Sequence, residues 1–449
     1  MSVVTRFAPS PTGHLQLGNI RTFLITYLFG RSQQGKCILR IDDTDLERSK
    51  DEYTESIKCD LTWLGIAWDD YRHQKGRDDV YNAARDKLLA ANRLYACYET
   101  EDELALKRKS ALGRGLPPIY DRAALKLTDE QKAAFEAAGR KPHYRFLLEH
   151  KPIAWKDMVR GKVEFHGKDI SDPVLIREDG TALYHLGSVV DDIEYGVTHI
   201  VRGEDHVSNT AFHTQMFEAL GATPPTFAHL PLVFDAEGKK LSKRLGSLSI
   251  ATLRDDEGLE PITIAAFLAR LGTSDPIEPF AQIDELIKQF DFSRFSRSNP
   301  RFIDEELFRL NAKILHRMNY AEAKPRLEKM GLADLDEDFW NVARANISRF
   351  KEIEQWWHVA KGPVTPIIDE ADKDYATQAL GLLPATPWDS TTWTTWVDAI
   401  KSATGRTGKN LFMPLRQALT GMGHGPDMPH LLLLIGHDMA KERLQGKNC

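Results

Sequence analysis

The residues from Arg6 to Arg21 form a turn that contains proline and glycine and lies between two apolar segments. Pro9 and Pro11 disfavour helix before them, and apolar residues recur at helical spacing after Gly18. We therefore expect a short strand, a turn and a helix that begins near Gly18. The first N–H groups of such a helix are unpaired and carry partial positive charge, which suits a phosphate or a carboxylate. Taken alone, the same pattern also fits an ordinary turn with capping groups.

Three more groups of charged residues follow. Residues 42–45 place three carboxylates at the end of an apolar run, where a doubly wound sheet binds its ligand. Arg202 ends another apolar run, as Arg6 does, and two such arginines can hold a carboxylate bidentately. Four of the six residues in 239–244 are cations, which indicates an anionic partner. Each group also has an ordinary explanation. Residues 42–45 could be an acidic turn that caps the next helix, Arg202 could pair with a neighbouring Asp, and residues 239–244 could be a solvated loop.

The order of the patterns predicts an α/β protein with a helical C-terminal part. Charged segments dominate between about 70 and 172, and we interpret this part as an inserted module. Beyond about residue 250 the strand pattern ends and helical patterns continue. The segments that we interpret as strands of a parallel sheet are 37–41, 172–177, 187–192 and 197–202.

The size and charge of the chain limit its class. The 449 residues are enough for several domains, and the net charge of −6 argues against non-specific adhesion to nucleic acid or membranes. The four cysteines are scattered, so disulfides are not expected. No segment has the pattern of a signal peptide or a transmembrane helix. We therefore expect a cytoplasmic protein with no membrane contact.

Five motifs occur in order along the chain. They are Arg6-Phe-Ala-Pro-Ser-Pro-Thr-Gly, Leu39-Arg-Ile-Asp-Asp-Thr-Asp, Val189-Val-Asp-Asp, Arg202-Gly-Glu-Asp-His with Asn209-Thr210, and Lys240-Leu-Ser-Lys-Arg. With these five motifs the chain strongly resembles bacterial glutamyl-tRNA synthetases. The resemblance implies a class I aminoacyl-tRNA synthetase fold, in which an α/β Rossmann-type catalytic domain is split by a connective insertion and followed by an all-α region. The implied domains are two catalytic halves at 1–70 and 173–250, an acceptor-end-binding insertion at 71–172, a stem-contact region at 251–310 and a helical anticodon-binding domain at 311–449.

The resemblance also implies a reaction. L-Glutamate is ligated to the 3′ end of tRNA(Glu) with ATP, through a glutamyl-adenylate intermediate, and we expect a monomer. Mg²⁺ is expected to enter with ATP, whereas the cysteines that bind zinc in some relatives are missing around Cys97 and Tyr120, so no structural zinc is expected. The alternatives are a paralogue that charges tRNA(Gln) with glutamate and a non-catalytic RNA-binding relative. The helical domain's sequence does not decide between the two tRNAs.

Residue roles follow from the resemblance by position. Lys243 is expected to neutralise phosphate charge in the transition state, supported by Lys240 and Arg244, while Gln16 lies in the first signature loop. The expected ATP contacts are Gly18, Asn19, Asp205 and Lys243. The expected glutamate contacts are Arg6, Ala8, Ser10, Asp42, Tyr184, Ser188 and Arg202.

Four positions depart from the family pattern. Gln16 stands where His is usual, and because an amide is never cationic we expect ATP activation that is weaker or differs in its pH dependence. Asp42 replaces a more frequent Glu and is one methylene shorter. Ser188 stands where Asn is often found, and Leu245 replaces a common His.

Overall fold

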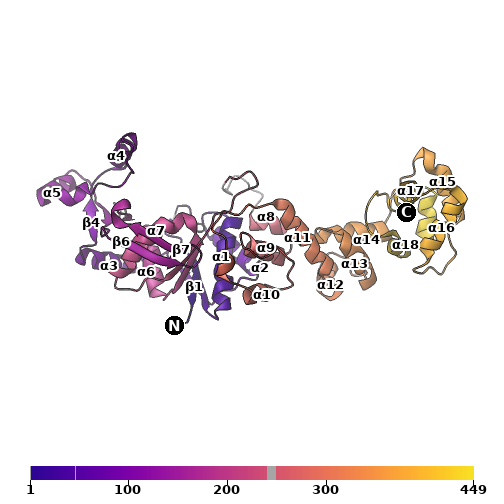
Figure 1. Cartoon of the computed structure of the whole chain (residues 1–449), viewed down its shortest axis with the longest axis horizontal. Helices are drawn as coiled ribbons and strands as arrows, with labels where there is room; N and C mark the ends of the chain where they lie inside the picture. Colours follow the sequence, from indigo (N-terminus) through magenta and orange to yellow (C-terminus); the bar gives the residue numbers. More distant parts are fainter. Residues whose placement is uncertain (1, 46, 240–248) are drawn as a thin grey trace. The chain divides into compact units, whose positions relative to one another are not determined.

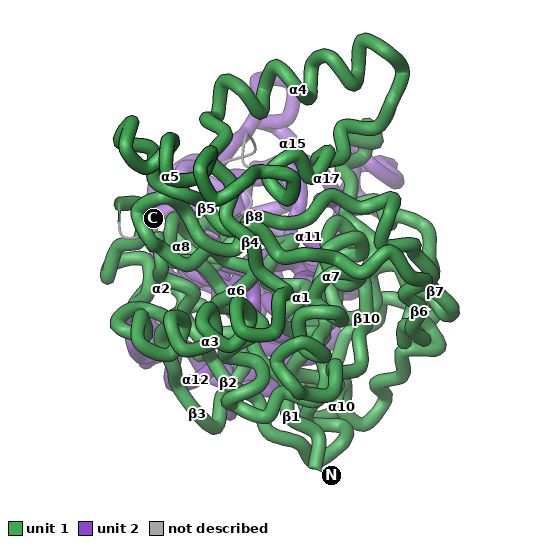
Figure 2. Tube along the Cα trace, turned by 90° about the vertical axis from the view of Figure 1, so that its left-hand side faces the viewer, with its two compact units in different colours: residues 1–256, 264–303 green, residues 257–263, 304–449 purple. Residues whose placement is uncertain are grey.

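The computed structural model describes residues 2–45, 47–239 and 249–449. The chain divides into two compact units, shown in green and purple in Figure 2. Unit 1 contains residues 1–256 and 264–303, and unit 2 contains residues 257–263 and 304–449. In the described part of the chain, every strand belongs to unit 1.

Parallel strands lie at the centre of unit 1 (Figure 1). β1 (Val4–Phe7), β2 (Lys36–Ile41) and β3 (Asp70–His73) pair in that order. β9 (His199–Gly203) pairs with β10 (Thr226–Leu230), also in parallel. The two groups lie side by side, because the backbone N–H of Thr198 donates to the carbonyl of Val4 at 3.0 Å.

Helices connect these strands as the hydrophobic pattern predicts. α1 (Leu17–Ser32) links β1 to β2 and α2 (Asp51–Trp63) links β2 to β3. β2 is buried at five of its six positions, which is typical of a strand covered on both faces. The strand-to-helix turn near Gly18 and the strand at 37–41 are therefore confirmed.

Two of the five predicted strands are corrected by the structure. Residues 187–192 belong to the helix α6 (Tyr184–Glu194), where seven consecutive residues from 186 to 192 are buried. A short buried run has no periodicity that distinguishes a helix from a strand. The segment 172–177 contains β8 (Val174–Ile176), but this strand pairs antiparallel with β5 (His143–Phe146) rather than in a parallel sheet.

The region between β3 and β8 carries a separate set of strands. β4 (Leu94–Cys97) pairs antiparallel with β5, and β6 (Pro152–Asp157) forms a hairpin with β7 (Gly161–His166). The hairpin rests on β10, since the backbone N–H of Met158 donates to the carbonyl of Phe227 at 2.9 Å. The helices of this region and the one after β9 are α3 (Asp78–Ala90), α4 (Glu101–Gly113), α5 (Asp129–Ala137) and α7 (Val207–Ala219).

The described residues from 250 onward form helices and turns without a strand, which confirms the predicted helical part. In unit 2 the core is built around Trp340 and Trp396, both fully buried. None of the described helices is both long and apolar enough to cross a bilayer. The helices are α8 (Ile250–Asp255), α9 (Pro261–Arg270), α10 (Ile283–Lys288), α11 (Asp304–Arg317), α12 (Tyr320–Lys329), α13 (Glu337–Ala343), α14 (Ile353–Lys361), α15 (Lys373–Gly381), α16 (Thr392–Thr404), α17 (Lys409–Thr420), α18 (Met428–Ile435) and α19 (His437–Leu444).

Candidate active site

A cavity of about 780 Å³ lies in unit 1, where the residues after β1 and at the end of β9 meet the start of α1. This is the crevice at the carboxyl ends of parallel strands, the usual ligand site of such a sheet. Nine of the residues predicted from the sequence line it. They are Arg6, Ala8, Ser10, Gln16, Gly18, Asn19, Tyr184, Arg202 and Asp205.

The start of α1 presents a positive helix end to this cavity. Gln16 occupies the N-cap position in an extended conformation, and its side chain makes no capping hydrogen bond to the helix. Its amide nitrogen instead lies 3.3 Å from the backbone oxygen of His14. No acidic residue occupies the first turn, so no nearby carboxylate of the helix itself offsets its partial charge. A Cβ added at Gly18 would meet no atom within 4 Å, so a ligand can approach this backbone closely.

The two predicted arginines have different partners. Arg6 donates from Nε to both carboxylate oxygens of Asp192, at 3.1 and 3.3 Å. Arg202, equally buried at 6% exposure, has no carboxylate within 4 Å among the described residues. Its guanidinium instead donates to His229 Nε2 at 3.2 Å and to the Thr210 hydroxyl at 2.5 Å. The charge of Arg202 is therefore oriented but not neutralised within the described protein.

Histidines surround Arg202 in their neutral form. Burial, followed by the charge of Arg202, lowers the pKa of His185 and of His206 to about 4. The same two causes, in the same order, lower the pKa of His213 well below its usual range. For His229, burial lowers the pKa and the hydrogen bond to Asp157 partly offsets that effect. At pH 7 these rings therefore add no positive charge to that of Arg202.

Two predicted glutamate contacts, Asp42 and Ser188, are not among the described residues that line the cavity. Both instead contact Arg40, which is fully buried. Arg40 donates from Nε to Asp42 at 2.6 Å, from Nη1 to Asp192 at 2.7 Å and from Nη2 to the Ser188 hydroxyl at 3.3 Å. Since Asp192 also binds Arg6, this network lies directly behind Arg6 and fixes one side of it.

Sequence reasoning gave no role to Arg40, Asp157, His213 or His229. A local signal existed for Arg40, because this charged residue lies inside the apolar segment that forms β2. The other three carried no such signal. Asp157 and His229 are 72 positions apart in the chain and meet only in the folded structure.

Most of the basic loop lies outside the described residues. Lys240, Lys243, Arg244 and Leu245 lie in 240–248, outside the described residues. The residue after this segment, Ser249, forms a bridge with Gln16, and the backbone N–H of Ile250 donates to the carbonyl of Leu15 at 3.3 Å. The chain therefore continues from the loop beside the start of α1, at the edge of the cavity. Asp205 lines the same cavity.

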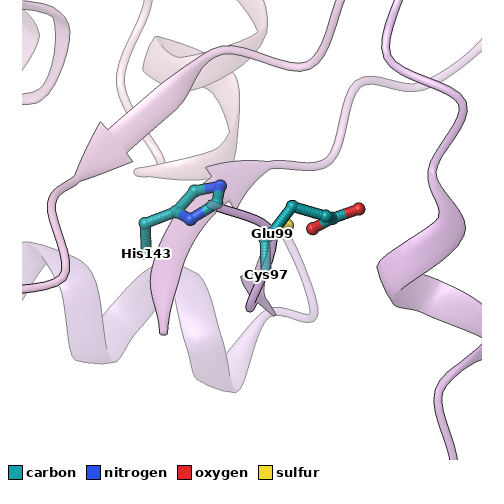
Figure 3. Close-up of side chains that lie close together, drawn as sticks. All are labelled: Cys97, Glu99 and His143. Carbon is teal, nitrogen blue, oxygen red and sulfur yellow. The ribbon is translucent and has the colours of Figure 1, made fainter. Parts of the chain in front are cut away.

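A second group of polar side chains is Cys97, Glu99 and His143 (Figure 3), none of which is among the described residues that line the cavity. Cys97, Glu99 and His143 have ligand atoms within 4.8 Å of one another, one ligand short of a structural zinc site. Glu99 already accepts hydrogen bonds from the Tyr120 hydroxyl at 2.8 Å and from Lys107 Nζ at 3.2 Å. Burial raises the pKa of the Cys97 thiol to about 12, which disfavours the thiolate that zinc requires. The residues present fit a hydrogen-bonded cluster better than zinc, and one bridging water would suit the buried, unpartnered atoms of Glu99 and His143.

The chain matches family models and known proteins along its length. Residues 2–309 match the family described as tRNA synthetases class I (E and Q), catalytic domain, and residues 341–447 match an anticodon binding domain. The chain is 52% identical to glutamate--tRNA ligase 1 of Maricaulis maris, over 98% of this chain and 99% of that protein. It is 51% identical to glutamate--tRNA ligase of Azospirillum brasilense, over all of both chains. A crystal structure of a glutamate tRNA ligase from Elizabethkingia meningosepticum in complex with its amino acid is similar, with a TM-score of 0.86, 27% identity and 99% coverage of both chains.

Proposed function

The chain belongs to the class I tRNA synthetases for glutamate and glutamine, and from this premise we propose that it ligates L-glutamate to the 3′ end of tRNA(Glu) with ATP. The observation that carries the proposal is the cavity that brings the buried, unneutralised Arg202 to the positive end of α1. An amino acid with two carboxylates and a triphosphate are the two anions that such a cavity can hold together. Relatives of the same length that carry the name glutamate--tRNA ligase support the same activity.

The reaction has two steps. A carboxylate oxygen of glutamate attacks the α-phosphorus of ATP, the bond to the β-phosphate breaks and pyrophosphate leaves. The terminal 2′-hydroxyl of the tRNA then attacks the glutamyl carbonyl, its proton is lost and AMP leaves. Both steps depend on positioning and on neutralising charge more than on covalent help from the protein.

We assign Arg6, Arg202 and Tyr184 to the carboxylates of glutamate, with Ala8 and Ser10 near its ammonium group. Asp42 and Ser188 then act indirectly: both contact Arg40, and Arg40 shares Asp192 with Arg6. This arrangement differs from the direct contact that the family resemblance implies. Replacing either side chain is expected to alter the orientation of Arg6, which lines the cavity.

ATP is assigned to the other half of the cavity. Gly18 and Asn19 offer backbone and side-chain donors at the start of α1, with Asp205 nearby. Lys243 is assigned to the phosphate charge of the transition state, with Lys240 and Arg244 near it in the sequence. Gln16 forms a β-bridge with Ser249, the first described residue after this loop. Among the described lining residues Asp205 is the one carboxylate, so we expect Mg²⁺ to bind through the phosphates of ATP rather than in a protein cage.

Aminoacylation with purified tRNAs tests this function. With ATP and labelled glutamate, the intact protein is expected to charge tRNA(Glu). Charging of tRNA(Gln) alone would instead establish the tRNA(Gln)-specific alternative, and charging of neither would favour the non-catalytic RNA-binding alternative. The same preparation tests the expected monomer, since light scattering should give a mass near 50.8 kDa.

The domain assignment and the compartment are further parts of the proposal. We assign catalysis and acceptor-end binding to 1–250, stem contacts to 251–310 and anticodon binding to 311–449. The anticodon-binding model matches 341–447 within the last range, and the catalytic-domain model extends to 309. Cys37, Cys59, Cys97 and Cys449 are free thiols, which suits the cytoplasm. A binding assay with an anticodon stem-loop and the full chain would test the assignment of 311–449 through substitutions there.

A further inference from the structure

We propose that Asp157 and His229 are positioning residues that hold the guanidinium of Arg202 in its glutamate-binding orientation. The proposal rests on the proposed function of the cavity. Neither side chain is among the described residues that line that cavity, and neither was singled out by the sequence. The three side chains form a hydrogen-bonded series from the β6–β7 hairpin to the amino acid site.

The series is short and buried. Asp157 Oδ2 lies 2.5 Å from His229 Nδ1, and Arg202 Nε donates to His229 Nε2 at 3.2 Å. Asp157 and His229 are 2% and 0% exposed, and Arg202 is 6% exposed. Solvent therefore does not compete for these contacts, and each one fixes the next.

The chemistry of the groups determines which nitrogen of His229 carries the proton. The guanidinium of Arg202 can only donate, so His229 Nε2 must accept. The proton of the neutral ring then lies on Nδ1 and is donated to Asp157. Hydrogen bonds, chiefly the one from His229, lower the pKa of Asp157 to about 2, although burial opposes them, so its carboxylate stays ionised and accepts. In the opposite tautomer Nε2–H could donate to the Thr210 hydroxyl, 2.8 Å away, but Arg202 Nε would face an N–H and have no acceptor on the ring.

The backbone of the hairpin holds Asp157 in place. Its other oxygen, Oδ1, accepts from the backbone N–H groups of Val159 and Arg160, each at 3.0 Å, and from that of His229 at 3.1 Å. Oδ2 also accepts a long hydrogen bond of 3.4 Å from the indole of Trp155. The orientation of Asp157 is thus fixed by four donors other than the imidazole N–H.

This arrangement has a consequence for substrate binding. A carboxylate in direct contact with Arg202 would orient it equally well, but it would also cancel the charge that glutamate needs. Because the neutral ring of His229 lies between them, the carboxylate of Asp157 orients Arg202 through His229 without contacting it. Removing the carboxylate of Asp157 is expected to weaken glutamate binding and to leave ATP binding nearly unchanged.

Asp157→Asn tests the proposal with an isosteric change. Three backbone N–H groups favour keeping the Asn oxygen at the Oδ1 position, so its NH₂ faces His229 Nδ1. That ring nitrogen must then accept, the ring proton moves to Nε2, and Arg202 Nε loses its acceptor while Nη2 keeps the Thr210 hydroxyl. We expect KM for glutamate to rise about 10–100-fold, the usual effect of a lost hydrogen bond to a charged group. KM for ATP should change less than about twofold.

Asp172→Asn is the matched control. Asp172 is also buried, at 1% exposure, and accepts from the backbone N–H of Leu148, from the Tyr95 hydroxyl and from Arg122 Nη2. In the described structure it is not hydrogen-bonded to Arg202, His229 or Asp157. This variant should leave the ratio of the KM values for glutamate and ATP as in the wild type. An equal change of that ratio in both variants would show a general effect of losing a buried charge and would overturn the proposal.

A spectroscopic measurement tests the same step without activity. Nitrogen-15 NMR of the histidine-labelled full chain should show His229 with a protonated Nδ1 in the wild type and a protonated Nε2 in Asp157→Asn. A wild type with the Nε2–H tautomer would overturn the proposal even if the enzyme charges tRNA(Glu). Failure of the wild type to charge any tRNA with glutamate would instead contradict the proposed function, so the two failures are distinguishable.

A second substitution tests whether Asp157 acts through His229. In His229→Gln the side-chain oxygen can still accept from Arg202, whatever occupies position 157. Adding Asp157→Asn to this variant should change KM for glutamate by less than about twofold, because the effect on the tautomer no longer exists. A further 10-fold or larger rise would show that Asp157 acts by another route and would contradict the proposal.

Discussion

Two buried arginines in unit 1, Arg40 and Arg202, differ in the charge of the side chains that they contact. Arg40 lies against the carboxylates of Asp42 and Asp192, with Asp191 at 3.9 Å. Arg202 lies against the neutral groups of His229, His213 and Thr210. Both are at least nine-tenths buried, so exposure does not explain the difference.

The comparison indicates that Arg40 has a structural role and that Arg202 is available to bind an anionic ligand. Arg40 and its partners form an ion-pair network that needs no further anion. Arg202 is held by neutral acceptors, and the missing negative charge must come from outside the described protein. A buried arginine whose partners are all neutral therefore indicates the amino acid site more clearly than the presence of a buried arginine alone.

The largest expected effect separates the two arginines by stability. Arg40→Met leaves Asp42 buried without the cation that it contacts and leaves Asp192 paired with Arg6 alone, and it should lower the free energy of unfolding by about 3–5 kcal/mol. Arg202→Met leaves the neutral Thr210 and His229 hydrogen-bonded to each other and should cost about 1–2 kcal/mol. Denaturant unfolding monitored on both variants measures the difference, and equal losses would remove the distinction between the two sites.

The next effect concerns Lys243, which we assign to the phosphate charge of the transition state. Lys243→Ala should lower kcat about 10²–10³-fold, since one preorganised donor to a charge that develops in the transition state has this magnitude. Its stability should stay near that of the wild type, as expected for a charge that serves the ligand. Single-turnover aminoacylation measures the rate, with Lys239→Ala as the neighbouring control. Unchanged turnover in Lys243→Ala would refute its assigned role.

A smaller effect is expected from pH. The folded pKa values of His185 and His206, about 4, lie below the ordinary value of 6.5, so the unfolded chain binds more protons between pH 4 and pH 6.5. Stability from these rings is complete above pH 6.5 and falls as pH decreases toward 4, by at most about 1.4 kcal/mol per pH unit for each ring.

Denaturant midpoints at pH 7.5, 6 and 5 measure this dependence. His185→Asn should show a shallower fall than the wild type, because one of the rings with a depressed pKa is gone. A wild-type midpoint that stays constant from pH 7.5 to pH 5 would mean that the histidines near Arg202 are not held neutral, and the contrast with Arg40 would weaken.

Much of the fold could be predicted because the responsible signals are local. The prolines and Gly18 fix the turn before α1, and the apolar run at 37–41 fixes β2. The signal failed at 187–192, where a helix buried along its whole length has the same composition as a buried strand. It also could not give the direction of β8, because strand pairing depends on residues far away in the chain.

The candidate site also contains residues that the sequence predicts and residues that it does not. The sequence motifs include Arg6, Gln16, Gly18, Arg202 and Asp205, and all five line one cavity in the folded chain. The residues that orient them could not be found in the sequence, because each depends on a long-range contact. Arg40 reaches Asp192 across 152 positions, and Asp157 reaches His229 across 72.

The most direct test of the account is the preference between glutamate and glutamine, which differ by the charge at the end of the side chain. Calorimetric titration of the intact protein should show glutamate binding about 10–100-fold tighter than glutamine, the effect expected of a charge-assisted contact with Arg202. In Arg202→Met this preference should disappear while ATP still binds. A variant that keeps the full preference for glutamate would contradict the assignment of Arg202 and, with it, the distinction on which this account of the cavity depends.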